Sequence, residues 1–408
     1  MTTATPSMPR LTLTQPRDER NAWLLWGLFF VVLAIGILAG DDRSVTYQYS
    51  AAARHWLQGE DLYERGGRGF LYLPQAAILF VPFSLLPQAL AEIIWRMLTV
   101  GIFACGVFRL CRLAEAHGGV RLFPLVTCVT IPIAYSAARN GQATLIIAGL
   151  MMIAVDEFSQ RNWTRAAVLL SFGLAFKPLT FVLMLLVAAL DRRMIGRLAV
   201  GFGILLAIPY FAQDWRYVTA QYGCCVEMLR TAAHLGVNLP WAQLFGMLHT
   251  AGLDVSEPVQ MALRIGFAGF TLLAAWLAYR RLPPERCGMY LYALAGCYLM
   301  LFNPRTENNT YALVAPAIGL FCAEAFLVER NFRQGAAIAL AAVGIVCRYE
   351  VGILLMPTAR PVWMAPLMCV GFSTVLLGQL FRETFGSTTP SSAPAVSLPA
   401  CLPHQLAG

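Results

Sequence analysis

The chain has 408 residues, of which 58% are hydrophobic and 13% are charged, whereas soluble domains carry roughly 25% charged residues. Apolar runs of about 18 residues or more recur along it, and such a run can cross the hydrocarbon core of a bilayer as a helix. We therefore expect an all-α polytopic membrane protein. The net charge of +8 does not indicate nucleic acid binding, because the arginines are scattered in small clusters between apolar runs, as topology signals are.

The first apolar run, Ala22–Ala39, is too long for the core of a signal peptide, so we expect a retained membrane span. Three arginines precede it and place residues 1–21 in the cytoplasm: Arg10, Arg17 and Arg20. The following segment, residues 41–87, would then be a first loop on the periplasmic side.

This first loop contains two predicted interfacial helices. Val45–Leu57 carries Tyr49, Ala52, Ala53 and Trp56 at helical spacing, which is typical of a helix lying at the membrane surface. Prolines divide Leu73–Leu86 into pieces too short to cross ~30 Å, so we expect this part to be a second interfacial or a re-entrant segment.

Arginine clusters alternate between the ends of the remaining apolar runs and predict about 12 membrane helices with both termini in the cytoplasm. All of them belong to one membrane domain, residues 22–382, with a second large periplasmic loop at 213–258. Residues 383–408 are rich in Pro, Ser and Ala and predict a disordered cytoplasmic tail. The predicted spans are Ala22–Ala39, Gln88–Phe108, Leu122–Ala138, Ala143–Val155, two halves of Ala166–Leu190, Leu198–Phe211, Val259–Tyr279, Gly288–Phe302, Thr310–Leu327, Ala336–Cys347 and Trp363–Phe381.

The run Ala166–Leu190 has two interpretations. Arginines at both of its flanks indicate the cytoplasmic side, and Lys177-Pro178 divides it into halves of about 12 residues, roughly 18 Å each as helix. A hairpin of two short helices with Lys177 at its outer turn satisfies the charge rule. The alternative is a single span kinked at the proline.

Unusual polar residues fall at the predicted outer ends of segments that lie far apart in the sequence. A carboxylate beside several cations can bind a lipid phosphate and activate a hydroxyl, because the cations stabilise the leaving phosphate and the carboxylate accepts a proton. These residues are Asp41 and Asp42, Arg139 and Gln142, Lys177, Arg305 and Glu307, and Arg348 and Glu350.

Each of these residues also has a purely structural explanation. The two aspartates could form a solvated cap, Arg139 and Arg305 could extend to lipid headgroups, and Arg348 could pair with Glu350. Lys177 is harder to explain in this way, because it is the only lysine in the chain and lies within an apolar run.

The order of several short motifs resembles that of glycosyltransferase family 87, membrane enzymes of the GT-C superfamily that use polyprenyl-phosphate-linked sugars. The resemblance covers nearly the whole chain from Ala22 to Phe381. The motifs are an aspartate after the first span, Tyr49 in an alanine-rich helix, Gly59-x-x-Leu62-Tyr63, Phe70-x-Tyr72-x-Pro74, Pro82-x-x-x-x-Pro87, Arg139-Asn140-Gly141-Gln142, Lys177-Pro178, and Pro304-Arg305 before Tyr311.

The resemblance implies a GT-C-type helical bundle and an aspartate in the first outer loop as catalytic base. Asp42 is the preferred candidate because it lies further into the loop, and Asp41 is the alternative. Some family members carry a histidine in the outer loop before the tenth helix, where this chain has Arg305-Thr306-Glu307-Asn308-Asn309.

We therefore expect an inverting single displacement that moves a mannose-like hexose or a pentose from polyprenyl phosphate to a hydroxyl of a glycolipid, glycan or protein. The enzyme would lie in a bacterial cytoplasmic (inner) membrane with its active site facing the periplasm, and without a metal or another cofactor. Lys177, Arg139 and Arg305 would bind the lipid phosphate. The substrate-binding candidates are Tyr72, Gln142, Glu307, Asn308 and Arg348.

A transporter or a flippase for lipid-linked sugars is the alternative function. Such proteins tend to carry internal repeats and polar breaks near the middle of the membrane. Here the charges lie at one set of helix ends, which favours chemistry at the membrane surface.

Overall fold

The computed structural model describes residues 16–41, 43–63, 69–115, 120–235, 241–356 and 361–386, and this part of the chain is helical without strands. Asp42 and the tail after residue 386 lie outside the described residues. The helices are α1 Pro16–Leu38, α2 Thr46–Gln58, α3 Pro74–Ser84, α4 Gln88–Glu115, α5 Phe123–Arg139, α6 Thr144–Ser159, α7 Trp163–Phe176, α8 Thr180–Leu190, α9 Arg192–Ala207, η1 Ile208–Phe211, α10 Trp215–Leu235, α11 Leu244–Thr250, α12 Glu257–Arg281, α13 Pro284–Phe302, η2 Asn308–Leu313, α14 Ala315–Ala323, the π-helical turn η3 Glu324–Val328, α15 Phe332–Val346, α16 Arg348–Leu355 and α17 Met364–Phe385.

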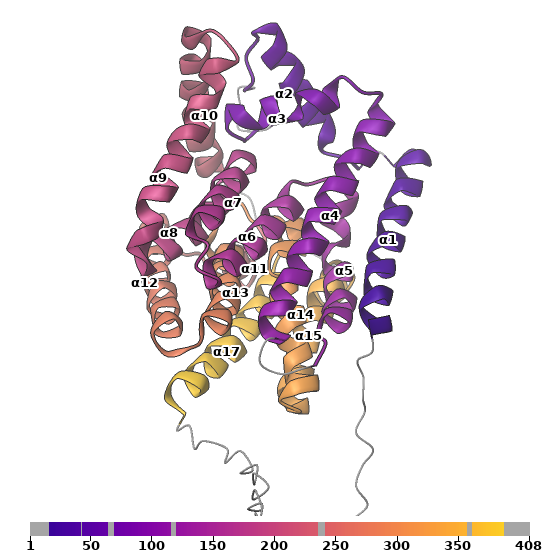
Figure 1. The fold of residues 1–408 in the computed structure, drawn as a ribbon, viewed down its shortest axis with the longest axis vertical. Coiled ribbons are helices and arrows are strands. Elements are labelled where there is room, and N and C mark those ends of the chain that lie inside the picture. The colour runs from indigo at the N-terminus through magenta and orange to yellow at the C-terminus, as the bar shows by residue number, and fades with distance from the viewer. Residues whose placement is uncertain are drawn as a thin grey trace, which may run out of the picture.

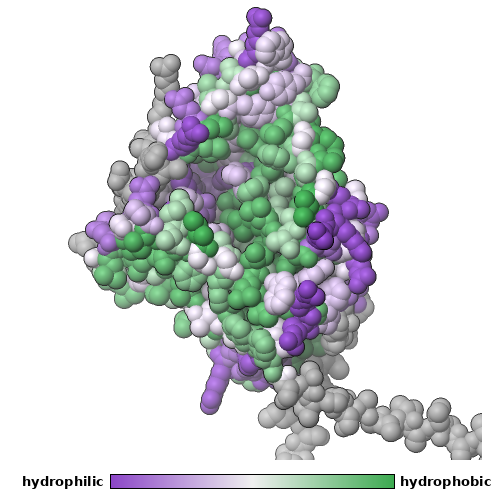
Figure 2. Space-filling model, turned by 90° about the vertical axis from the view of Figure 1, so that its left-hand side faces the viewer, coloured by the Kyte–Doolittle hydropathy of each residue, from purple (hydrophilic) through white to green (hydrophobic). Residues whose placement is uncertain are grey.

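The helices form a bundle with two distinct ends (Figure 1). The upper end carries α2, α3 and α10 and is called the loop end below, whereas α17 and the start of α15 lie at the opposite end. α1 packs against α4 and α5 on one side of the bundle. On the other side, α9 and α12 expose large apolar residues such as Val200 and Ile265, and Figure 2 shows a broad hydrophobic area on that face.

The centre of the bundle is formed by α6 and α13, in which nearly every residue is buried. Both helices are apolar around their whole circumference, as expected for the interior of a membrane bundle. α4 crosses α6 closely at Gly106 and Gly149, because a Cβ atom added at Gly106 would lie 2.8 Å from the Gly149 backbone. Such pairs of small residues allow helices to approach each other within membranes.

The helix predicted at Val45–Leu57 is confirmed as α2, and its buried face contains the expected residues Tyr49, Ala52, Ala53 and Trp56. The proline-divided segment is the 11-residue helix α3, about 16 Å long and too short to span a bilayer. The position of both helices at a membrane surface stays a prediction.

The protein has several membrane-length helices and is a multi-pass membrane protein, but the count of about 12 spans is not confirmed. Several predicted spans are shorter helices, such as α7 with 14 residues and α8 with 11. Within the described ranges, five helices are long and apolar enough to cross a membrane, and a sixth candidate is the pair α15–α16, bent by 82°. The five are Asp18–Leu38, Gln88–Glu115, Arg192–Phe211, Glu257–Arg281 and Met364–Phe385.

α7 and α8 form the predicted hairpin rather than one kinked span. Arg193, just after α8, stacks on the ring of Trp163 at the start of α7, and the two flanks line one cavity. Lys177 therefore lies at the turn between the two helices, at the loop end. It begins an extended turn because Pro178 disfavours a helical conformation of the residue before it.

The segment 213–258 contains the 21-residue helix α10, where only a loop was expected. Its buried residues Val218, Gln221, Cys225 and Met228 recur every three or four positions, which is the pattern of an amphipathic helix. This face packs against α3. The helix therefore covers the first loop rather than extending away from it.

Candidate active site at the loop end

The end of α1 meets the end of α5 through an ion pair between Asp41 and Arg139. Arg139 Nε donates to Asp41 Oδ2 at 2.5 Å, and the backbone N–H of Arg43 donates to Oδ1 at 3.2 Å. The hydrogen bond from Arg139 holds the pKa of Asp41 below its usual range, so this carboxylate is ionised at neutral pH. The pair stabilises the fold above the unfolded-state pKa of Asp41, and this contribution is lost as the pH falls through the lowered folded-state pKa.

The turn between α5 and α6 fixes the first loop against the bundle. The backbone N–H of Val45 donates to the Asn140 carbonyl at 3.0 Å, and Trp95 Nε1 donates to the Gly141 carbonyl at 2.8 Å. Gly141 has a positive φ of 63°, and a Cβ atom there would lie 2.6 Å from a guanidinium nitrogen of Arg96. The glycine of the Arg-Asn-Gly-Gln motif is therefore needed for both its conformation and its small size.

Arg96, on α4, contacts this turn and was not among the residues predicted from the sequence. Its side chain is only 1% exposed. Nη2 donates to Ser44 Oγ at 3.0 Å and to the Arg139 carbonyl at 2.9 Å, and Nη1 lies 3.2 Å from the Glu92 carboxylate. Arg96 thus connects α4 to the segments on both sides of the Asp41–Arg139 pair.

Lys177 lies next to two buried tyrosines of the first loop. The hydroxyl groups of Tyr49 and Tyr72 are 2.9 Å apart, and the Lys177 ammonium lies 5.6 Å from the centroid of the Tyr72 ring. Burial raises the pKa of Tyr72, and the nearby Glu307 carboxylate adds to this effect. Tyr72 is therefore a neutral hydrogen-bonding group between a lysine and a carboxylate.

Gln142 joins Glu307 to the same cluster. Gln142 is buried, and its Nε2 donates to Glu307 Oε2 at 2.9 Å. The loop that carries Glu307 is held in place by a bond from Ser136 Oγ on α5 to Asn309 Oδ1 at 2.5 Å. The loop-end cluster, as the term is used below, consists of Asp41, Arg139, Gln142, Glu307, Tyr49, Tyr72 and Lys177.

The other predicted residues are Arg305, Asn308 and Arg348. Arg305 stacks on Trp241 at 4.9 Å, and burial lowers its pKa, an effect opposed by Glu307. Asn308 donates to the Pro361 carbonyl at 3.3 Å. Arg348 is buried and donates to the Ile345 carbonyl at 2.6 Å, and among the described ion pairs none joins it to Glu350.

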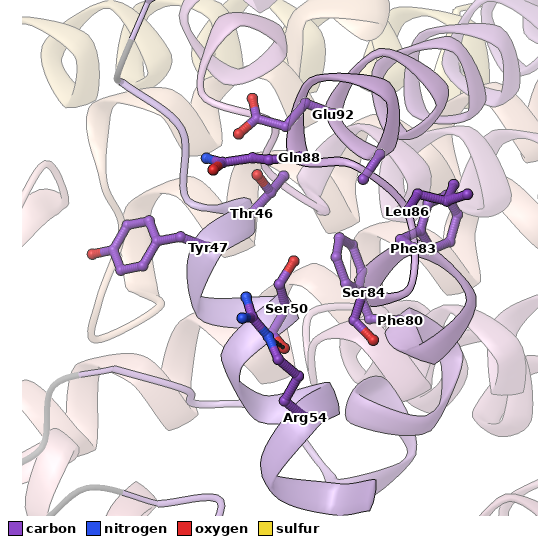
Figure 3. Close-up of a pocket in the computed structure, with 11 residues that line it drawn as sticks. Thr46, Tyr47, Ser50, Arg54, Phe80, Phe83, Ser84, Leu86, Gln88 and Glu92 are labelled. Atoms are coloured by element: carbon purple, nitrogen blue, oxygen red, sulfur yellow. Dashed lines mark hydrogen bonds between the residues drawn. The ribbon is translucent and has the colours of Figure 1, made fainter.

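A small cavity lies beside the cluster, between α2, α3 and the start of α4 (Figure 3). Its volume is about 260 Å³. Hydroxyl, amide and charged groups line it together with the aromatic rings of Phe80 and Phe83. Figure 3 shows Tyr47 pointing away from the other side chains. The lining residues are Thr46, Tyr47, Ser50, Arg54, Phe80, Phe83, Ser84, Leu86, Gln88, Ala91 and Glu92.

This cavity is connected to the loop-end cluster through hydrogen bonds. Thr46, in its lining, lies 2.7 Å from Ser44 through their hydroxyl oxygens. Glu92, also in its lining, pairs with Arg96, which in turn binds Ser44 and the Arg139 carbonyl. A ligand that contacts Glu92 in the cavity would therefore be connected to Arg139 through Glu92 and Arg96.

The sequence and structure match known proteins as follows. The sequence model of Glycosyltransferase family 87 matches residues 70–304. A Mycobacterium tuberculosis protein, polyprenol-phosphate-mannose-dependent alpha-(1-2)-phosphatidylinositol mannoside mannosyltransferase, is 27% identical over 327 residues, which cover 72% of this chain and 74% of that protein. The match to the family includes Tyr72, Arg139, Gln142 and Lys177 but neither Asp41 nor Arg305.

Two solved structures also align with this one. ArnT from Cupriavidus metallidurans in the apo state aligns over 90% of this chain and 78% of that chain, with 16% identity and a TM-score of 0.41. The same protein bound to undecaprenyl phosphate aligns over the same shares with 16% identity and a TM-score of 0.37.

Proposed function

The chain belongs to glycosyltransferase family 87, and on this premise we propose that it transfers a sugar from a polyprenyl phosphate carrier to an acceptor hydroxyl. The name of the mycobacterial relative, a polyprenol-phosphate-mannose-dependent mannosyltransferase, supports this class of donor. The sugar is a mannose-like hexose or a pentose. The acceptor is a glycolipid, a glycan or a protein.

The observation that carries the proposal is the loop-end cluster itself. Its members come from α1, the first loop, the α5–α6 turn, the α7–α8 turn and the loop after α13. A lysine, an arginine and two carboxylates therefore meet at one end of an apolar bundle. This is the combination of charges that transfer from a phosphate carrier requires.

The proposed reaction is a single displacement that inverts the anomeric carbon. The acceptor oxygen attacks this carbon while Asp42 takes the hydroxyl proton, and the bond from carbon to the phosphate oxygen breaks. Polyprenyl phosphate leaves with the bonding electrons. Lys177, Arg139 and Arg305 stabilise the negative charge on its phosphate.

Asp41 is the weaker of the two candidates for the base. Both of its carboxylate oxygens already accept hydrogen bonds, from Arg139 and from the Arg43 backbone. Its lowered pKa also makes it a weaker proton acceptor. We therefore assign Asp41 the role of orienting Arg139 and assign Asp42 the role of base.

An apolar cavity between α12, α13 and α17 is a suitable place for the polyprenyl chain. It has a volume of about 260 Å³ and an almost entirely apolar lining that includes Phe267, Leu301 and Phe302. Phe302 ends α13, three residues before Arg305. A polyprenyl chain bound there would bring its phosphate toward the loop-end cluster.

The small polar cavity of Figure 3 is the proposed acceptor site. Its hydroxyl groups, the Gln88 amide and the Glu92 carboxylate offer several hydrogen-bond partners, as a polyhydroxylated ligand requires. Through Glu92 and Arg96 it is connected to Ser44 and to the Arg139 carbonyl. A sugar of the acceptor would occupy it with one hydroxyl directed to the cluster.

Replacing Ser50 by tryptophan is expected to fill this cavity and to raise the KM for the acceptor by about tenfold, equivalent to ~1.4 kcal/mol of lost binding free energy. The KM for the donor should not change. Leu57→Trp is the matched control, because Leu57 lies on the same helix, is 51% exposed and does not line the cavity. The measurement is steady-state kinetics with each substrate varied in turn. Equal acceptor KM values for the two variants would show that the acceptor does not bind in this cavity.

We also propose a bacterial inner membrane location with the loop end facing the periplasm. Residues 22–382 would form the membrane domain, with periplasmic loops at 41–87 and 213–258. The arginine-rich turns at the opposite end, such as those of Arg161 and Arg192, support a cytoplasmic position of that end. The function itself is tested by acceptor-dependent release of polyprenyl phosphate from a polyprenyl-phosphate sugar.

A further inference from the structure

A third cavity opens at the opposite end of the bundle from the loop-end cluster. The α6–α7 turn, the α8–α9 junction and the α12–α13 turn form it, and its volume is about 740 Å³, within the range of roughly 300–1,000 Å³ typical of ligand sites. α6 and α7, with 16 and 14 residues, separate it from the loop-end cluster by about 20 Å. The proposed transfer reaction has no use for this cavity.

Four arginines line this cavity with a single carboxylate. They are Arg161, Arg192, Arg193 and Arg280, and the carboxylate is Asp191. Within the described part of the chain, none of the four guanidinium groups forms an ion pair with a carboxylate. Asp191 itself accepts hydrogen bonds from the Arg193 backbone at 2.8 Å and from the Tyr279 hydroxyl at 3.1 Å.

The cavity therefore has an excess of three positive charges that the surrounding protein does not neutralise. The four arginines are exposed, so solvent screens much of their mutual repulsion, and an anion lying between them would be attracted by all four. Planar guanidinium groups bind phosphate oxygens through pairs of parallel N–H donors. The aromatic rings of Phe158, Trp163 and Tyr279 form walls of the cavity, and Arg193 stacks on Trp163 with 5.7 Å between its guanidinium carbon and the ring centroid.

The backbone of Arg161 has a conformation that is unusual for a residue other than glycine. Its φ is +61°, a left-handed conformation that glycine adopts at a lower cost than other residues. The turn ends α6, where glycine is the usual residue in this conformation. An arginine here brings a guanidinium group to the cavity at the expense of backbone strain.

We propose that this cavity binds a phosphate-bearing anion. Two sources share this chemistry: the headgroup of an anionic lipid in the adjacent leaflet and a free phosphorylated compound. In either case the anion would neutralise the four arginines and join the α6–α7, α8–α9 and α12–α13 connections. The proposal does not depend on which aspartate is the base or on the donor sugar.

The test uses full-length protein and two probes. Inorganic pyrophosphate is titrated into protein in nanodiscs of zwitterionic phosphatidylcholine, and phosphatidic acid is added to detergent-solubilised protein for native mass spectrometry. The cavity variant is Arg161→Gln/Arg192→Gln, since neither side chain forms a hydrogen bond or ion pair with the described residues. The matched control is Arg330→Gln/Arg333→Gln, which also removes two exposed arginines. Like Arg161, Arg330 has a left-handed backbone conformation, with a φ of 52°.

The proposal predicts that at least one probe binds the wild type and the control equally, and binds the cavity variant about tenfold more weakly. Pyrophosphate binding in phosphatidylcholine nanodiscs would identify a free ligand, whereas binding of phosphatidic acid alone would identify a lipid headgroup. The proposal is overturned if the cavity variant differs from the control by less than about threefold for both probes, or if neither probe binds the wild type below about 1 mM. Transfer activity, measured in parallel, tests the proposed function separately.

Discussion

Asp42→Asn is expected to lower kcat by about 10²–10⁴-fold, the usual contribution of a general base. Asparagine has the same shape and retains one acceptor oxygen but cannot take a proton. The KM values for donor and acceptor should change little, because the lost interaction develops only as the acceptor oxygen attacks. The measurement is steady-state kinetics of sugar transfer by the purified enzyme in liposomes.

Asp41→Asn is the matched variant, and we expect it to lower kcat by less than about tenfold. The Asp41–Arg139 pair is partly exposed, and such pairs contribute about 0.2–1 kcal/mol. Its loss would loosen Arg139 without removing the proton acceptor. The reverse order of effects would make Asp41 the base, and full activity of both variants would exclude an aspartate base in this loop.

Lys177→Gln is expected to lower kcat by about 10²–10³-fold, the effect of removing one group that stabilises charge in a transition state. The stacking of Lys177 on Tyr72 at 5.6 Å contributes about 0.5–2 kcal/mol to stability, because the pair is partly buried. The variant should therefore fold normally. A melting temperature within a few degrees of the wild type, together with the loss of kcat, would separate catalysis from folding.

Two further variants show whether the charge at position 177 acts on a phosphate. Lys177→Arg retains the charge but replaces a compact ammonium with a planar fork, so we expect intermediate activity. Arg216→Gln removes a cation from α10, also at the loop end, where Arg216 stacks on Trp215, and should leave activity unchanged. A similar loss in Arg216→Gln and Lys177→Gln would indicate a general effect of charge at this end rather than a phosphate contact.

Local patterns predicted several parts of this fold correctly. The spacing of Tyr49, Ala52, Ala53 and Trp56 predicted the buried face of α2, because one face of a helix must meet the bundle. The arginines on both flanks of Ala166–Leu190 predicted the hairpin with Lys177 at its turn. The same charge rule placed the residues of the loop-end cluster at one set of helix ends, where they now meet.

Such local patterns could not predict contacts between segments that lie far apart in the sequence. The bond between Gln142 and Glu307 joins residues 165 positions apart, and no local period specifies it. Arg96 was missed because it lies inside a predicted span, although Glu92 four residues before it on the same helix face was a usable signal. Helix α10 was also missed, because the polar residues of segment 213–258 obscured its amphipathic spacing.

The most direct test of the proposed function is the release of free polyprenyl phosphate from a polyprenyl-phosphate sugar by the purified protein in liposomes. The donors are a polyprenyl-phosphate hexose and a polyprenyl-phosphate pentose, each supplied with and without a glycolipid extract as acceptor. The proposal predicts release that depends on acceptor, equals the amount of glycosylated product and is lost in Asp42→Asn. Transport of the intact lipid-linked sugar across the bilayer, without any release of polyprenyl phosphate, would contradict it.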